Sequence, residues 1–279
     1  MNLYDIMKRR RSVRYFKHEK IPEQILNELL DVANNAPSGG NIQPISIIVV
    51  ETKESREELA KIVGYQPWVK NAPISMLFCI DYYRVKRWAA QSNTTFQGER
   101  LLSFFLIAYA DIMCAAQNVV VLAESYGLGS VFVGSILQSI DKARDFFSIP
   151  KYVVPVMILS LGYPEYIPSY MPKLERNITI HKEKYHILSD DEIKKAYEQK
   201  YGDFDVDAET YLEKAYIEVV EADKQQDESW VEWAKDRMKK LDIQNHAQFL
   251  FNLRYPTQKM AKWNKKQMQL FKNAGFDFL

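Results

Sequence analysis

The sequence predicts a central β-sheet with helices on both faces over residues 1 to about 180, followed by a helical extension. Short, continuous apolar segments rich in β-branched residues alternate with segments whose apolar residues recur at helical spacing. Strands that are apolar throughout are typical of a sheet covered on both faces. From about residue 190 onward, amphipathic helix patterns dominate instead.

The first elements are two helices and a strand. Residues 2–10 are predicted to form a short helix, and residues 12–16 an extended segment. Pro22 suits the first turn of a second helix. One face of that helix would carry Ile25, Leu26, Leu29, Leu30 and Ala33. It should end at residues 37–41, a Pro-Ser-Gly-Gly-Asn loop sequence, before a strand over residues 45–50.

The following elements continue the alternation. Residues 54–63 are predicted to form a short helix and residues 74–81 a continuous apolar strand. Residues 84–99 are aromatic and show no clear period. Residues 101–126 favour a long helix whose near-continuous hydrophobicity predicts burial on most sides. The remaining predicted elements are a strand over 131–136, a helix over 140–147 and a strand over 153–161.

The composition is ordinary for a globular protein. Of the 279 residues, 47% are hydrophobic and 26% charged. The formal net charge of +1 gives no sign of a nucleic-acid or membrane-surface partner. The N-terminus lacks the apolar core of a signal peptide, and the apolar stretches are expected to be too short to span a membrane, so a cytoplasmic location is predicted. Cys79 and Cys114 are expected to be buried free thiols, and the four histidines show no metal-site spacing.

The first motif that suggests chemistry is the basic segment of residues 9–14, Arg-Arg-Arg-Ser-Val-Arg. Arginine presents a planar fork of donors that suits phosphate oxygens. In an extended segment Ser12 and Arg14 would share one face, after a turn that carries Arg10 and Arg11. The segment could hold a phosphate at one end and a polar ring edge at the other, or it could be a solvated basic turn.

The second motif is the loop of residues 36–44, Ala-Pro-Ser-Gly-Gly-Asn-Ile-Gln-Pro. A loop between a helix and a strand is a common place for a ligand in sheet-based proteins. Its small residues would let a flat ring approach the backbone. The amides of Asn41 and Gln43 could bind the edge of such a ring. A bare turn is an equally good interpretation.

Two further motifs follow at the later strands. Residues 127–135, Gly-Leu-Gly-Ser-Val-Phe-Val-Gly-Ser, lack the spacing and context of a dinucleotide-binding fingerprint. The glycine after the strand could instead bring backbone amides to a flavin, or the segment could be a plain helix-to-strand connection. Residues 161–165, Leu-Gly-Tyr-Pro-Glu, are followed by basic residues over 173–176 that could return to a phosphate or lie in a surface loop.

In their order and spacing, these motifs resemble the FMN-dependent nitroreductase family over about residues 1–176. The resemblance implies an α+β three-layer sandwich, with a mixed central sheet flanked by helices over residues 1–180. Residues 181–279 would form a C-terminal helical extension that packs on the main domain or on a dimer partner. It also implies a homodimeric enzyme with FMN in two interface clefts. Hydride would pass in a ping-pong cycle from NADH or NADPH through flavin N5 to an electron-poor acceptor such as a nitroaromatic or a quinone.

The resemblance also assigns residues to FMN. Arg10, Arg11, Ser12 and Arg14 would bind FMN. Arg10 or Arg11 would bind the phosphate, and Arg14 would lie nearer the N1/O2 edge of the ring. The residues that would line the ring and the ribityl chain are Pro37, Ser38, Gly39, Asn41 and Gln43. No side chain is assigned a catalytic role, because water can supply the protons, and no metal is expected.

The later motifs contribute less directly to the expected site. Gly134 and Ser135 would face the ring near N5 through their backbone, because they stand where some members have a Glu-Gly pair. Lys173 is the candidate for a further phosphate ligand, although the usual basic pair is reduced here to one lysine. Residues 88–99, with the aromatic residues beside them, would form a lid over the flavin.

Other interpretations stay open at this point. The same scaffold could carry a sibling chemistry: reductive dehalogenation, enone reduction or fragmentation of the flavin. The chain could also bind FMN as a sensor or storage module without turnover. A protein with a phosphate site and no flavin would require two separate motifs to coincide. The sequence does not distinguish NADH from NADPH, because the nicotinamide rests on the flavin and leaves no motif of its own.

Overall fold

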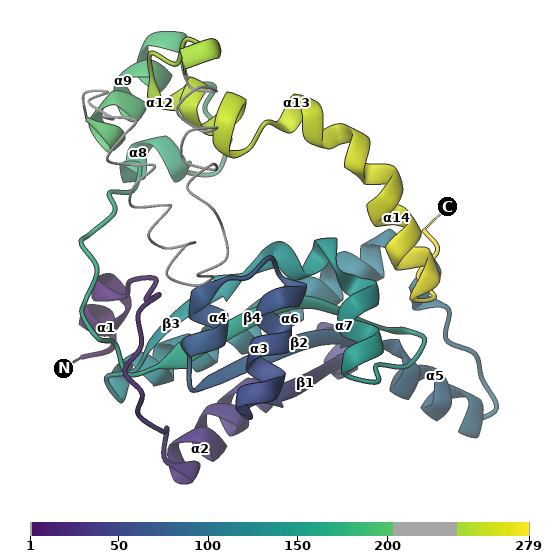
Figure 1. The fold of residues 1–279 in the computed structure, drawn as a ribbon. Helices are drawn as coiled ribbons and strands as arrows, with labels where there is room; N and C mark the ends of the chain where they lie inside the picture. The colour runs from purple at the N-terminus through teal and green to yellow at the C-terminus, as the bar shows by residue number, and fades with distance from the viewer. Residues whose placement is uncertain (1, 203–238, 279) are drawn as a thin grey trace. The chain divides into compact units, whose positions relative to one another are not determined.

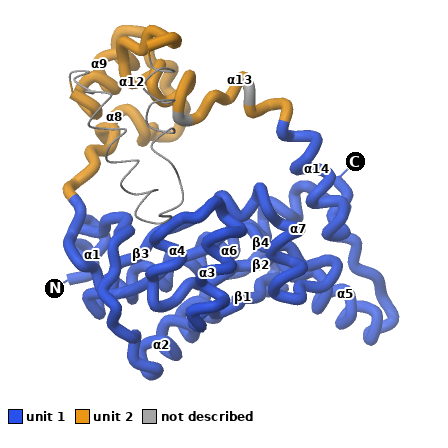
Figure 2. The backbone as a smooth tube through the Cα atoms, in the orientation of Figure 1, with its two compact units in different colours: residues 1–168, 263–279 blue, residues 169–262 orange. Residues whose placement is uncertain are grey.

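The computed structural model describes residues 2–202 and 239–278 (Figure 1). Contacts within the chain define two units, shown in different colours in Figure 2. The first unit contains residues 1–168 and 263–279, and the second contains residues 169–262. The sheet lies in the first unit, and the regular elements in the described part of the second unit are helices.

The middle layer of the first unit is a four-stranded sheet. Its strands are β1 (Ile45–Val50), β2 (Ile74–Asp81), β3 (Gly129–Val133) and β4 (Val153–Gly162). They lie in the order β1-β2-β4-β3, and all three ladders are antiparallel. In the described part of the chain, the parallel pairing of the expected mixed sheet is limited to one bridge, between Ser12 and Ser130. β3 begins two residues earlier than predicted, and it ends earlier because the chain turns into a 3-10 helix at Gly134–Gln138.

Helices cover both faces of the sheet, as the apolar strands predict (Figure 1). One face packs against α2 (Glu23–Asn34), α6 (Leu102–Ser125) and α14 (Asn264–Asn273). The other packs against α3 (Lys53–Ile62), α4 (Pro67–Asn71) and α7 (Ile140–Phe146). In β2 the side chains alternate between the two layers, with Met76 and Phe78 in the first and Leu77 and Cys79 in the second. The result is a three-layer sandwich.

The sequence did not predict α4 or α5 (Tyr82–Gln91). α4 has only five residues, too few for a periodic pattern to emerge. In α5 the buried residues are Tyr82, Val85 and Ala89. Their helical spacing begins at Tyr82, so it was not visible when residues 84–99 were considered as one segment. Asp81 caps the helix by accepting a hydrogen bond from the backbone N–H of Arg84.

The expected lid over residues 88–99 is partly core. The Tyr82 and Phe96 rings contact each other edge to face at 5.1 Å, and Phe276 stacks on Tyr82 at 5.4 Å. Lys86 Nζ lies 2.6 Å from Glu99 Oε1, which fixes α5 to the 3-10 turn Gly98–Arg100. The expectation of a covering aromatic surface is therefore wrong for Tyr82 and Phe96, whose rings are committed to packing.

The long helix α6 differs from two expectations. By length and composition alone it could cross a membrane, which contradicts the expectation that every apolar stretch is too short. The expectation that this helix is buried on most sides is also wrong. Its core-facing residues are Ala108, Ile112, Ala115, Ala116, Val119, Val120 and Ala123. Leu102, Leu106 and Ile107 are 55%, 57% and 50% exposed, so an apolar face remains uncovered.

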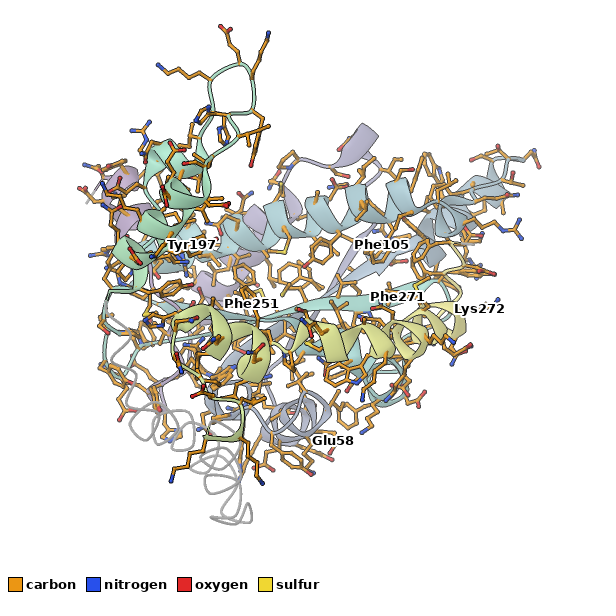
Figure 3. All side chains as sticks on the ribbon, turned by 90° about the horizontal axis from the view of Figure 1, so that it is seen from above. Glu58, Phe105, Tyr197, Phe251, Phe271 and Lys272 are labelled. Carbon is orange, nitrogen blue, oxygen red and sulfur yellow. The ribbon has the colours of Figure 1, made fainter. Side chains whose placement is uncertain are left out.

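The C-terminal segment completes the core of the first unit. Phe105 of α6 and Phe271 of α14 lie side by side, with ring centroids 5.2 Å apart (Figure 3). The backbone N–H of Tyr152 donates to Ala274 O at 2.7 Å, and that of Asp277 to Glu99 O at 3.0 Å. The end of the predicted helical extension thus belongs to the sheet-containing unit.

The described part of the second unit consists of short helical segments. They are α8 (Arg176–Thr179), α9 (Asp190–Tyr201), α12 (His246–Gln248), the π-helical segment Phe249–Arg254, α13 (Thr257–Met260) and the start of the 3-10 helix Ala261–Trp263. A capping box of Ser189 and Glu192 begins α9. Tyr201 stacks on His246 at 4.8 Å. The part of the predicted extension over residues 203–238 lies outside the described residues.

The two cysteines lie in different environments. Cys79 is buried in the middle of the sheet, as expected, but Cys114 is exposed, so the expectation of two buried thiols is wrong for Cys114. Burial raises the pKa of the Cys79 thiol well above its usual value.

Cys79 should resist thiol reagents in the native protein. The thiolate is the reactive form, and burial both disfavours it and blocks access to it. With iodoacetamide at pH 8, peptide mapping should find Cys79 unmodified until denaturant is added. The Cys79→Ala variant identifies the peptide that carries the late label. Labelling of Cys79 at the same rate with and without denaturant would contradict the burial.

Candidate functional site

The basic N-terminal segment docks along the free edge of β3. It follows α1 (Leu3–Arg9), and the backbone N–H of Val13 donates to Ser130 O at 2.9 Å. Ser12 forms the parallel bridge with Ser130. Val13 and Phe16 are buried in a small cluster with Ala72 and Val131. The expected extended conformation is confirmed, and its cause is strand pairing combined with the burial of two apolar side chains.

Two arginines of this segment have different roles. One Arg11 Nη donates to the carbonyl oxygens of Lys8, Arg9 and Arg10, at 3.4, 2.7 and 3.0 Å, at the C-terminal end of α1. The half-buried Arg14 lies with its guanidinium 5.3 Å from the ring centroid of Trp68. In residues 2–202 and 239–278, its side chain makes no hydrogen bond or ion pair. Arg14, rather than Arg11, therefore has donors available for a ligand.

A carboxylate lies beside the arginine cluster. Glu124, at the C-terminal end of α6, lines a cavity of about 270 Å³ with Arg9, Arg11 and Gly129 among its other walls. Burial raises the pKa of Glu124, and the nearby cations of Arg10, Arg9 and Arg11 partly offset this effect. Glu124 thus places a partly buried carboxyl group beside the arginines, which the sequence alone did not indicate.

The residues after β3 present backbone, not side chains. Ser135 Oγ donates to Val63 O at 3.2 Å and accepts from Gln66 Nε2 at 2.7 Å, so this hydroxyl is used between α3 and α4. Gly134 is exposed, and a Cβ built there would meet no atom within 4 Å. A flat ligand has room beside Gly134.

A buried aspartate on α6 holds the loop of residues 36–44. Asp111 is 7% exposed and accepts from Ser38 Oγ at 3.0 Å and from the backbone N–H of Gly39 at 3.1 Å. Ser38 Oγ also accepts from the backbone N–H of Gln43 at 2.9 Å. A Cβ on Gly39 would lie 2.5 Å from Ile107 Cγ2, so any other residue would require the Ile107 side chain or the loop to shift. Sequence reasoning missed Asp111, whose only trace is one charge within an apolar helix.

The loop backbone is strained and its side chains are largely engaged. Gly40, Asn41 and Gln43 have positive φ angles of 59°, 54° and 49°. Gln43 Nε2 donates to Asn34 O at 3.1 Å. Arg84, which the sequence also did not indicate, donates to Gln43 O at 2.8 Å and to Ile45 O at 2.9 Å. The side-chain amide of Gln43 is thus used at the end of α2, whereas Pro37 and Asn41 are exposed.

The two halves of the expected site lie apart within one chain. The basic segment borders β3, and the loop precedes β1, at opposite edges of the sheet. On α6, Asp111 holds the loop and Glu124 lies at the arginines, 13 residues apart (111 to 124), or about 20 Å along the helix axis. Lys173 belongs to the second unit, in a segment without regular structure before α8, and is exposed.

The protein has an α+β fold in which a sheet lies between two layers of helices and a basic segment borders one edge of the sheet. A sequence model of the nitroreductase family matches residues 7–163, more than half of the chain, so the chain belongs to the nitroreductase family. The α+β nitroreductase-like fold that the sequence predicts is confirmed.

Individual relatives agree with this assignment. The NAD(P)H FMN reductase of Bacillus subtilis (strain 168) is 30% identical over 199 residues, covering 70% of this chain and 79% of the relative. A crystal structure from Bacteroides fragilis NCTC 9343 has a TM-score of 0.80 at 24% identity and covers 98% of this chain and 99% of that one. The NADPH:FMN oxidoreductase of Vibrio harveyi, complexed with NAD+, has a TM-score of 0.67 at 26% identity and covers 76% and 92%.

Replacing Asp111 should loosen the loop. Asp111→Ala leaves Ser38 Oγ and the N–H of Gly39 without their acceptor, which should lower the free energy of unfolding by about 1–3 kcal/mol. Asp111→Asn keeps one acceptor oxygen and should cost less. Urea unfolding measures both. Asp145→Ala, at an exposed position of α7, is the matched control, and equal stability of Asp111→Ala and this control would refute the anchoring role.

Proposed function

We propose that this chain is an FMN-dependent oxidoreductase that moves hydride from NADH or NADPH to an electron-poor organic acceptor, such as a nitroaromatic or a quinone, in a ping-pong cycle. Its membership of the nitroreductase family and its likeness to an FMN reductase support the enzyme class and the cofactor. The observation that carries the proposal is Arg14, whose guanidinium is half-buried beside the sheet with its donors uncommitted among the described residues. A cytoplasmic location stays a prediction.

The donors along the β3 edge fit FMN. A guanidinium and a hydroxyl, from Arg14 and Ser12, suit the polar edge of the ring. Gly134 offers backbone and open space for a planar group. Arg10 is the better candidate for the phosphate because Arg11 donates to the end of α1. The assignment of Lys173 as a further phosphate ligand stays a prediction from the sequence.

FMN, when bound, supplies the centre that accepts and returns the hydride. The chain's own residues bind and orient it. Arg14 would hold a positive charge at the N1/O2 edge and would favour negative charge on that side of the ring. Backbone groups of Gly134 and Ser135 would face the ring near N5, since the hydroxyl of Ser135 is engaged elsewhere. No side chain is assigned proton transfer, because water can supply the protons.

The separation of the two half-sites supports a homodimer. A second copy would bring its residues 37–43 to the β3 edge of the first, and two-fold symmetry would create two equal clefts. The uncovered apolar face of α6, with Leu102, Leu106 and Ile107, is the proposed contact between the copies. Because Ser38 and Gln43 are engaged within the loop, Pro37, Gly39 and Asn41 are its proposed contacts with FMN.

Anaerobic titration tests the activity. The purified protein should release FMN, not FAD, on heating, and NADH or NADPH should bleach the bound flavin. Nitroaromatics, quinones, enones and halophenols, added one at a time, should restore the colour at rates that rank the acceptors. If neither NADH nor NADPH bleaches the bound flavin, the proposed activity is wrong, and the chain is instead an FMN-binding module without turnover. If the protein does not take up added FMN, the proposal that it binds a flavin is wrong.

Arg14→Ala tests the position of the flavin. Loss of a charge-assisted hydrogen bond costs about 1.5–3 kcal/mol, which corresponds to a tenfold to hundredfold weaker FMN affinity. The midpoint potential of bound FMN should also become more negative, because a positive charge is removed. Flavin fluorescence and spectroelectrochemistry measure the two effects. Lys142→Ala, which removes an exposed cation on α7, should change neither the FMN affinity nor the midpoint potential. If Arg14→Ala also changes neither, the ring does not lie at Arg14.

A further inference from the structure

Trp68 is the side chain that holds Arg14. The guanidinium carbon of Arg14 lies 5.3 Å from the centroid of the indole, within the range of a cation–π contact. The indole also packs against two apolar clusters, one with Val13 and Val131 and the other with Val69 and its neighbours. Its Nε1 is buried and has no acceptor in the part of the chain that the structure describes. The ring therefore acts through its face and its apolar contacts.

The element that carries Trp68 is firmly fixed. Val69 is fully buried, and Arg56 Nη1 donates to Lys70 O at 3.0 Å and to Ala72 O at 2.8 Å, at the end of α4. At the start of the helix, Gln66 donates to Ser135 Oγ at 2.7 Å. α4 is thus connected both to α3 and to the chain just after β3. An indole on this element is a rigid support for a charged side chain.

We propose that Trp68 is a positioning residue for FMN binding, which holds the guanidinium of Arg14 at the site of the flavin's N1/O2 edge. This inference rests on the proposed function. An arginine side chain has many rotamers, and restricting them costs entropy at the moment of binding unless the protein has restricted them already. The indole face restricts Arg14 and takes none of its N–H donors. Trp68 would act on the cofactor only through Arg14 and would touch no reacting atom.

A double-mutant cycle on the full chain tests the proposal. FMN dissociation constants and midpoint potentials are measured for the parent, Trp68→Leu, Arg14→Ala and the double variant. Trp68→Leu should weaken FMN binding about threefold to thirtyfold, the range that one cation–π contact allows, and make the potential more negative. In the Arg14→Ala background the same change should have almost no further effect, because its only route to FMN is gone. Trp68→Phe, which keeps a ring face, should restore part of the loss.

Controls separate positioning from simple packing. Trp263→Leu removes an indole that is 47% exposed and should leave FMN affinity and potential unchanged. Thermal unfolding of each variant without added FMN reports stability independently. If Trp68→Leu does not fold, Trp68→Met carries the same cycle, because a thioether fills the space without a ring face.

Each contrary outcome has a distinct meaning. Equal effects of the Trp68 change with and without Arg14 would make Trp68 a packing residue and overturn the inference, while leaving the proposed function intact. The same holds if Trp68→Leu binds FMN as tightly as the parent. If Arg14→Ala alone changes neither affinity nor potential, the assignment of Arg14 to the flavin fails, and the role of Trp68 fails with it.

Discussion

The packing of α6 against the sheet is the constraint on which both halves of the site depend. One face of this helix is buried under the sheet, so its rotation and its position along its axis are fixed. Two acidic residues on it then lie at set positions: Asp111 anchors the loop before β1, and Glu124 lies among the arginines beside β3. Neither residue needs to contact a ligand to determine where the two segments proposed to bind FMN lie.

This arrangement has a consequence for assembly. A rigid helix that holds two half-sites about 20 Å apart prevents them from meeting within one chain. The same helix exposes Leu102, Leu106 and Ile107 on the side turned away from the core. Apolar surface of this kind is costly to leave in water, and covering it with a second copy gives the separated segments a way to meet. Stability of the assembly and completion of the site would then have one cause.

The sequence predicted the layers well and the site only partly. Strands buried on both faces leave long apolar runs, and those survive as local patterns. The different roles of Arg11 and Arg14 leave no such local pattern. Arg11 donates to carbonyl oxygens at the end of α1, whereas Arg14 contacts the indole of Trp68, 54 residues later in the sequence (14 to 68). Asp111 and Ser38 meet across 73 residues. The side-chain amide of Gln43 looked available in the sequence, yet a hydrogen bond that only the folded chain creates now occupies it.

The way in which each arginine is held decides what it can still bind. Arg56 and Arg84 are held by carbonyl oxygens, and their donors are used in that structural role. A carboxylate partner for Arg14 would have fixed it equally well, but it would also have neutralised the charge and occupied the guanidinium fork. An aromatic face attracts the cation through the quadrupole of the ring and leaves the N–H groups at the periphery open. Fixing Arg14 against Trp68 therefore combines a restricted position with an undiminished capacity to bind an anionic or carbonyl-bearing ring edge.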